Sequence, residues 1–156
     1  MKPLANFSVA RNPYNEVECS DHYARAMSSF GSFISMCGFE YDGPKGIIGF
    51  SPRLTPDHFR APFTSAEGWG TFSQTRDNEG MTATLETKHG TLRVSALKLT
   101  LPGSLNGATV KVKSGWHTHA ATLTQDGTTT SITLKTPLIL AKGESVLIRI
   151  KGKTGE

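Results

Sequence analysis

Residues 80–101 read GMTATLETKHGTLRVSALKLTL, and the fold follows from this stretch. Apolar residues recur there at every second position in three runs: Met81, Ala83 and Leu85, then Leu92 and Val94, then Leu97, Leu99 and Leu101. Such alternation is typical of a strand with one buried face. The parity of the apolar positions changes between Val94 and Leu97, which predicts a β-bulge near Ala96.

The same period of two continues towards the C-terminus. It is carried by Val110 and Val112, by Ile132 and Leu134, and by Val146, Ile148 and Ile150. Turn residues separate the runs at Asn106-Gly107, Asp126-Gly127 and Lys142-Gly143. This half of the chain therefore predicts six to eight antiparallel strands in a sandwich-like sheet.

The N-terminal half predicts a different structure, one long amphipathic helix. Its apolar residues recur at steps of four and three: Tyr23, Met27, Phe30, Ile34 and Cys37. Ser20 can cap the first turn, and Gly38 can end the helix in the left-handed conformation. Residues 39–74 follow as a Pro- and Gly-rich wrap of short strands and turns. The fold class predicted is α+β, divided into residues 1–78 and 79–156.

Length and composition exclude several functional classes. With 156 residues the chain suits one compact domain, and 37% apolar residues suffice for a core. It lacks an apolar run long enough to cross a bilayer and the apolar segment of a signal peptide, so we expect a soluble protein of unknown compartment. The two cysteines predict no disulfide framework or zinc motif.

The net charge of +4 does not favour nucleic acid as a partner. Seven Lys/Arg stand against eight Asp/Glu through Asn78, and ten against five from Glu79 onward. The lysines of the second half stand singly among apolar residues, as in Lys111-Val112-Lys113, which is typical of a solvated sheet face. No interleaved aromatic residues and no arginine cluster accompany them.

Residues 11–25, RNPYNEVECSDHYAR, hold the densest group of polar side chains in the chain. They can form an elaborate helix cap with surface ion pairs, or a site for a sugar, because carboxylates and guanidinium groups bind vicinal hydroxyls. Glu16 and Arg25 are the natural pair, and His22 is a further candidate ligand. Glu16 and Glu18 do not suit a catalytic pair, because both would lie on one side of the sugar.

Residues 12–74, from NPYNEVECSDHYARAMSSFGSF to AEGWGTFSQ, resemble the C-terminal part of glycoside hydrolase family 116, which includes bacterial β-glucosidases and the non-lysosomal glucosylceramidase. The resemblance implies that the helix ends an (α/α)6 barrel and that Glu16 and Arg25 contact glucose hydroxyls. The catalytic glutamate and aspartate motifs of that family lie upstream of this segment and are absent here.

The function expected is therefore the sugar-recognising, C-terminal part of a β-glucosidase-type hydrolase, not catalytic alone. It needs no cofactor or metal, and its partners would be a β-glucoside and the upstream catalytic region. The alternative is a free-standing, non-catalytic module that binds a carbohydrate or a protein. A truncated remnant without function is a third possibility.

Two further segments leave alternatives open. Glu67-Gly68-Trp69-Gly70 either packs in the core or forms a wall that supports the sugar site. His117 and His119 lie two residues apart beside Trp116, but the sequence offers no nearby third metal ligand before Asp126. We therefore expect a strand or turn pair there, beside an anchoring Trp116.

Overall fold

The computed structural model describes residues 23–77, 80–101, 103 and 105–154. They divide into two units, one that ends at Met36 and one that begins at Cys37. The first unit contributes most of a single helix, α2 (Tyr23–Cys37), in which the rings of Phe30 and Phe33 stack 6.1 Å apart. Gly38 follows with φ of 55°, the left-handed conformation expected at a helix end. No helix of the described residues is long and apolar enough to cross a membrane.

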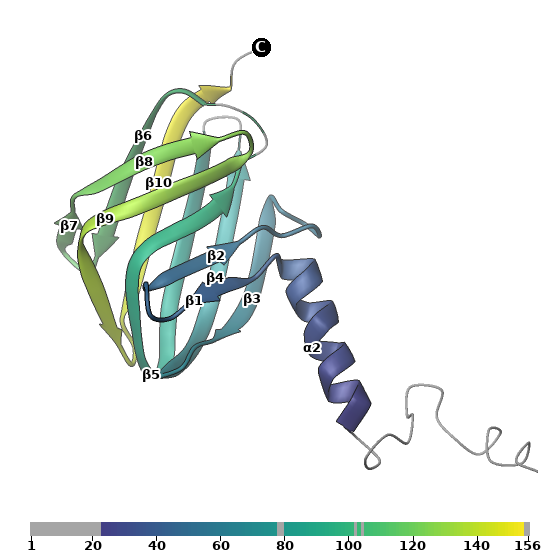
Figure 1. Cartoon of the computed structure of the whole chain (residues 1–156). Coiled ribbons are helices and arrows are strands. Elements are labelled where there is room, and N and C mark those ends of the chain that lie inside the picture. Colours follow the sequence, from purple (N-terminus) through teal and green to yellow (C-terminus); the bar gives the residue numbers. More distant parts are fainter. Residues whose placement is uncertain (1–22, 78–79, 102, 104, 155–156) are drawn as a thin grey trace, which may run out of the picture. The chain divides into compact units, whose positions relative to one another are not determined.

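The second unit consists of strands. They are β1 (Glu40–Asp42), β2 (Ile47–Phe50), β3 (His58–Thr64), β4 (Gly68–Asp77), β5 (Gly80–Thr100), β6 (Leu105–Ser114), β7 (His117–His119), β8 (Ala121–Asp126), β9 (Thr129–Ala141) and β10 (Ser145–Thr154). The long strand β5 belongs to two sheets. Its first half lies between β4 and β10, and its second half lies between β2 and β9 (Figure 1).

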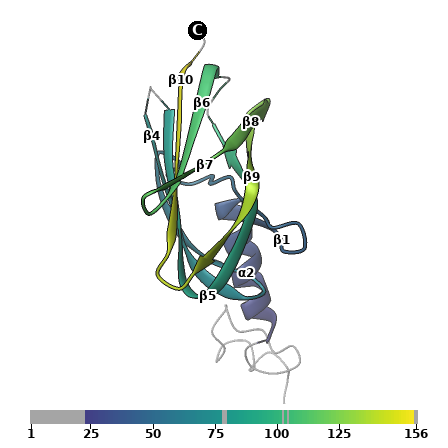
Figure 2. The ribbon, with the colours of Figure 1, turned by 90° about the vertical axis from the view of Figure 1, so that its left-hand side faces the viewer.

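We name the sheet β3-β4-β5-β10-β6-β7 sheet I and the sheet β1-β2-β5-β9-β8 sheet II. All strand pairs are antiparallel except β2 with β5, which is parallel. Figure 2 shows the two sheets from the side as two layers, with β5 curving from one layer into the other. The apolar core lies between them.

Two irregularities let β5 turn from sheet I into sheet II. Trp69 pairs with His89 and Gly70 with Thr87, so Lys88 has no partner on β4. The second irregularity lies between Val94 and Ala96, which confirms the predicted bulge. A bulge adds a residue to one strand and increases its local twist, so the two together redirect the chain.

The apolar residues predicted to face inward are all buried. Those on β5 are Met81, Ala83, Leu85, Leu92, Val94, Leu97 and Leu99, and Leu101 directly follows the strand, each exposed by 3% or less. Thr87 of β5 is buried as well, which the sequence did not predict. The buried apolar residues meet aromatic side chains from earlier strands, among which Phe50 and Phe72 stack in parallel at 3.9 Å. All the buried apolar side chains of the described residues come from residues 37–156.

The predicted α+β class, a long helix with a wrap and a terminal sandwich, is wrong, because the described chain is mostly strand. Residues 39–74, predicted as a Pro- and Gly-rich wrap of short strands and turns, form β1 to β3 and most of β4 in the same two sheets. Their prolines hid this pattern. Pro44, Pro52 and Pro56 lie between strands, and Pro62 lies exposed on edge strand β3, where a missing N–H costs no ladder bond.

The predicted turns had mixed outcomes. Asp126-Gly127 and Lys142-Gly143 lie at the turns that join β8 to β9 and β9 to β10, as expected. Asn106-Gly107 lies inside β6, next to a register shift against β10, so the turn predicted there is wrong. The domain boundary between residues 78 and 79 stays a prediction.

Candidate functional site

The residues predicted to bind a sugar at the helix start lie outside the side chains that the structure describes. Glu16 and His22 lie outside the described residues, and of Arg25 only the backbone position within α2 is described. The site at Glu16, Arg25 and His22 therefore stays a prediction. The described residues provide a second candidate site, which is built on Glu67-Gly68-Trp69-Gly70.

The two glycines of that segment lie where β4 and β5 approach most closely. A Cβ atom on Gly68 would lie 2.4 Å from the carbonyl oxygen of His89, and one on Gly70 would lie 1.9 Å from that of Glu86. Across the ladder Gly90, with φ of 71°, would place a Cβ 2.0 Å from the carbonyl oxygen of Glu67. Only glycine fits such contacts, so the spacing of the motif is set by backbone packing.

Trp69 lies between these glycines and points away from the core. Its side chain is 51% exposed, so the core-packing alternative is wrong. Its ring lies nearly parallel to that of His89, its partner across the bulge, with ring centroids 6.3 Å apart. The pair forms an exposed aromatic platform, which we name the Trp69–His89 platform.

A cleft of about 350 Å³ lies at the same corner of the strand unit. It is lined by Tyr41, Gly43, Pro44, Ala66, Glu67, Thr91 and Arg93. Both chain segments that carry the platform also contribute to the cleft, because Glu67 lies two residues before Trp69 and Thr91 two residues after His89. Its volume falls at the low end of small-molecule pockets, about 300–1,000 Å³.

Hydrogen bonds fix the charged groups of the cleft. The Thr91 hydroxyl donates to Glu67 Oε2 at 3.3 Å, and the Thr91 N–H donates to the Glu67 carbonyl oxygen at 3.1 Å. Arg93 Nη1 donates to the Pro44 carbonyl oxygen at 3.3 Å. A guanidinium has five N–H donors, so most of those on Arg93 remain available to a ligand.

The chemistry of this corner suits a polyhydroxylated ligand. A carboxylate accepts hydrogen bonds from hydroxyl groups, a guanidinium donates to them, and an aromatic ring stacks on the apolar face of a sugar ring. Neither Glu67 nor Arg93 forms an ion pair with a described residue. Both heads therefore keep hydrogen-bonding capacity for a ligand.

The histidine pair His117 and His119 brackets β7, as expected for a strand pair. No group of three His, Cys, Asp or Glu side chains with metal-binding geometry occurs among the described residues. The neighbouring Trp116 is fully exposed, so it does not anchor the pair as the sequence suggested. Cys37 is a buried free thiol, and burial raises its pKa.

Comparison of the sequence with protein-family models and with curated proteins gave no match. The resemblance to glycoside hydrolase family 116 therefore stays a prediction. Sequence reasoning identified Glu67 and Trp69 but missed Tyr41, His89 and Arg93. One signal for His89 was present: the apolar positions change parity between Leu85 and Leu92, which indicates a bulge in the part of the strand that contains His89.

Proposed function

We propose that the chain is the C-terminal, sugar-recognising part of a β-glucosidase-type glycoside hydrolase and is not catalytic by itself. In this proposal Glu16, Arg25 and His22 hold the sugar at the catalytic centre of the complete enzyme. The corner of the strand unit is a second place of sugar contact. The family assignment rests on the sequence resemblance alone.

The exposed Trp69–His89 platform beside the cleft carries the proposal of sugar binding. A large apolar ring that is half exposed gains free energy when a ligand covers it. Glu67 accepts hydrogen bonds from sugar hydroxyls in this arrangement, and Arg93 donates to them. A β-linked glucoside offers both the equatorial hydroxyls and the C–H face that such a corner can contact.

Tryptophan fluorescence of the whole chain tests the proposal, because the sequence contains two tryptophans. In a Trp116→Phe variant only Trp69 emits. Titration with cellobiose should then change the emission with a saturable, millimolar dissociation constant. Trp69→Ala should abolish binding measured by calorimetry, whereas Trp116→Ala should retain it.

Three results would contradict the proposal. One is an absence of heat and of any fluorescence change with cellobiose. The second is equal loss of binding in Trp69→Ala and Trp116→Ala. The third is unchanged β-glucoside turnover when Glu16→Ala is introduced into a full-length enzyme that contains this segment, which would remove the family assignment.

The alternative function is a free-standing, non-catalytic module. The observation that favours it is that residues 37–156 form one compact unit with its own apolar core. The helix gives the test. If the chain is a segment of a hydrolase, the apolar face of α2 lacks its partner. The chain should then self-associate, or bind an apolar dye, and the double variant Met27→Ser/Phe30→Ser should lose this behaviour. A monomer that binds no dye supports the module.

A further inference from the structure

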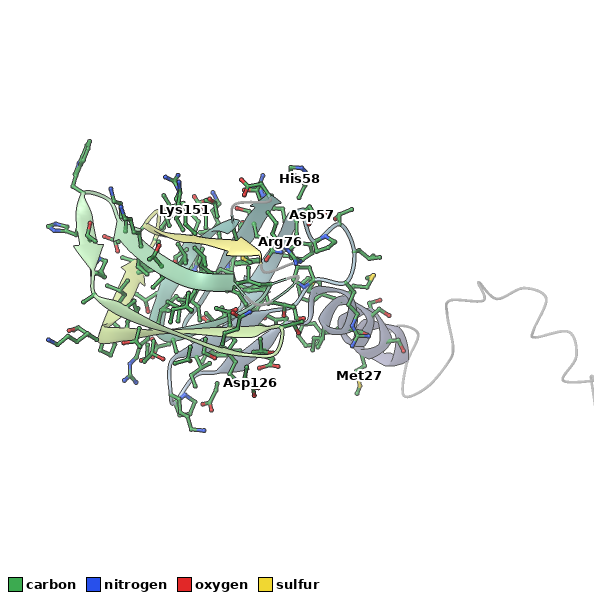
Figure 3. The ribbon with its side chains drawn as sticks, turned by 90° about the horizontal axis from the view of Figure 1, so that it is seen from above. Met27, Asp57, His58, Arg76, Asp126 and Lys151 are labelled. Atoms are coloured by element: carbon green, nitrogen blue, oxygen red, sulfur yellow. The ribbon has the colours of Figure 1, made fainter. Side chains whose placement is uncertain are left out.

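The outward side of sheet I carries a second chemical feature that the sugar proposal does not use. Strand alternation places two neighbouring cross-strand rows there: His58, Thr75, Thr82, Arg149 and Lys111, then Arg60, Ser73, Thr84, Leu147 and Lys113. Lys151 follows Arg149 on the same side of β10. We name this surface the basic face. Figure 3 shows His58 and Lys151 on the same side of the strand layers and Asp126 on the other.

Two cations of the basic face are direct neighbours. Arg149 on β10 pairs in register with Lys111 on β6, and both side chains are exposed. Residues paired in this way have Cβ atoms about 4.5–5.5 Å apart, and like charges directly opposite each other destabilise a sheet. Lys113 and Lys151 add two more charges at the next outward positions of the same strands.

The cations of the basic face form no ion pair with a described carboxylate. Arg60, Lys111, Lys113, Arg149 and Lys151 form no ion pair or side-chain hydrogen bond with a described residue. Glu86, on the same side of β5, is paired with Lys88. Asp77, at the end of β4, lines a cleft with Arg149 and Lys151. An anion bound here would therefore reduce the repulsion between Lys111 and Arg149, which no ion pair among the described residues offsets.

Hydroxyl groups lie between the basic side chains of β3 and those of β10. Ser73, Thr75, Thr82 and Thr84 separate His58 and Arg60 on β3 from Arg149 on β10. Two shallow clefts cross this strip, one of about 320 Å³ over β3 to β5 and one of about 240 Å³ beside Arg149 and Lys151. Thr82 lines both clefts. Strands lie about 4.8 Å apart, so the strip from β3 to β6 is about 19 Å wide.

The combination of cations and hydroxyl groups favours one class of anionic polymer over another. A single-stranded nucleic acid is bound by aromatic rings on which its bases stack, and the two rows contain no Phe, Tyr or Trp. A polysaccharide with carboxylate or sulfate groups offers anions for the cations and hydroxyls for the serine and threonine side chains. Its length can also span both clefts.

We propose that the basic face of sheet I binds an anionic polysaccharide, with its strongest contact at Lys111 and Arg149, at the β10–β6 end of the strip. This site is separate from the Trp69–His89 platform, and it does not depend on the proposed function. It gives the chain a means of attachment to an acidic glycan.

The experiment measures binding of heparin to the whole 156-residue chain by calorimetry at several salt concentrations, with neutral dextran and an oligothymidylate as comparison polymers. Heparin should bind, dextran should not, and the oligothymidylate should bind more weakly than heparin. The double variant Lys111→Gln/Arg149→Gln should lose about ten-fold in affinity at low salt, with a shallower salt dependence.

A matched control removes the same charge elsewhere. The double variant Lys45→Gln/Lys135→Gln also lowers the net charge by two. Lys45 lies in an exposed turn before β2, and Lys135 lies on β9 of sheet II. This variant should keep most of the heparin affinity. Trp69→Ala should bind heparin normally, which separates this site from the sugar site.

The proposal is overturned if heparin does not bind, or if the control double variant loses as much affinity as Lys111→Gln/Arg149→Gln. Tighter binding of the oligothymidylate than of heparin would overturn the choice of a polysaccharide. Unchanged circular dichroism and melting of each variant are required, so that lost affinity reports the face and not unfolding.

Discussion

The outward sides of the two sheets are built by the same alternation of residues, yet they treat charge differently. On sheet II Lys98 forms an ion pair with Glu40 at 3.3 Å, although strand β2 lies between them. Gly49 is the residue in the middle of that row, and because it has no side chain the two long side chains meet above it. On sheet I the corresponding neighbours of Arg149 are Thr82 and Lys111, so its charge stays unpaired.

The comparison teaches that a solvated face cannot be recognised from alternation alone. Lys98 and Lys111 have the same sequence context, a lysine between two aliphatic residues on a strand. Which side chain stands two strands away decides whether the charge is neutralised, and only the register of the sheet determines that.

The largest loss of stability is expected in the apolar core that the two sheets share. Phe72→Ala removes a ring that is fully buried and stacked on Phe50. We expect a loss of about 3–5 kcal/mol in the free energy of unfolding, measured by chemical denaturation. Trp116→Ala removes a fully exposed aromatic ring and should change stability little. Equal losses in the two variants would contradict the core described here.

The bend that gives β5 to both sheets should be the next most sensitive point. Gly90→Ala adds a methyl group 2.0 Å from the Glu67 carbonyl oxygen and must keep φ near 71°. We expect a loss of about 2–4 kcal/mol, from backbone strain and overpacking together. The control is Gly127→Ala, which has a similar φ of 57° but no atom within 4 Å of the added methyl. Gly127→Ala therefore measures the backbone strain without overpacking. If it loses as much stability as Gly90→Ala, the close approach of Gly90 to the Glu67 carbonyl is not the cause of the loss.

Relief of charge repulsion on the basic face should raise the free energy of unfolding, by less than the two preceding variants lower it. Lys111→Thr removes the cation opposite Arg149 and adds a residue suited to strands, so stability should rise by about 0.5–1 kcal/mol at low salt. The gain should shrink at high salt, because screening weakens the repulsion in the parent. Lys113→Thr, opposite Leu147, should gain less. A gain that does not change with salt would show that repulsion is not its cause.

The ion pair on sheet II should matter least for stability. Lys98 and Glu40 are both exposed, and pairs of this kind contribute about 0–1 kcal/mol. Lys98→Gln should therefore lower the denaturation midpoint slightly at low salt and not at high salt. If Lys98→Gln destabilises more than Gly90→Ala, the ranking of packing above surface charge fails.

A pH titration measures the local charge of sheet II directly. The Lys45 ammonium and the Lys45 N–H both donate to Asp42, and these hydrogen bonds lower the pKa of that carboxyl. A depressed pKa stabilises the folded state above the ordinary pKa of the carboxyl, and this contribution is lost as the pH falls through the folded-state pKa. In Lys45→Gln the pKa of Asp42, followed by carbon NMR, should rise towards its ordinary value. An unchanged pKa would exclude the ammonium as a cause.

Several parts of the structure were determined by the sequence alone. The inward residues of β5, the bulge beyond Val94 and the turns before β9 and β10 all followed from local periodicity and turn chemistry. These features are local, because a strand buries every second residue whatever its partner is. The α2 helix was also visible, since its apolar steps of three and four need no knowledge of the rest of the chain.

Tertiary structure alone decided the strand order, the double membership of β5 and the sites on the surface. Pairing of β2 with β5, about 50 residues apart, follows from the packing of both sheets on one core, and no local pattern encodes it. The same holds for the approach of Glu67 to Thr91 and for the row that joins Lys111 to Arg149. Alternation decides which side of its sheet each residue faces, but the register between distant strands decides which residue stands beside it, and that register is fixed only when the whole core is assembled.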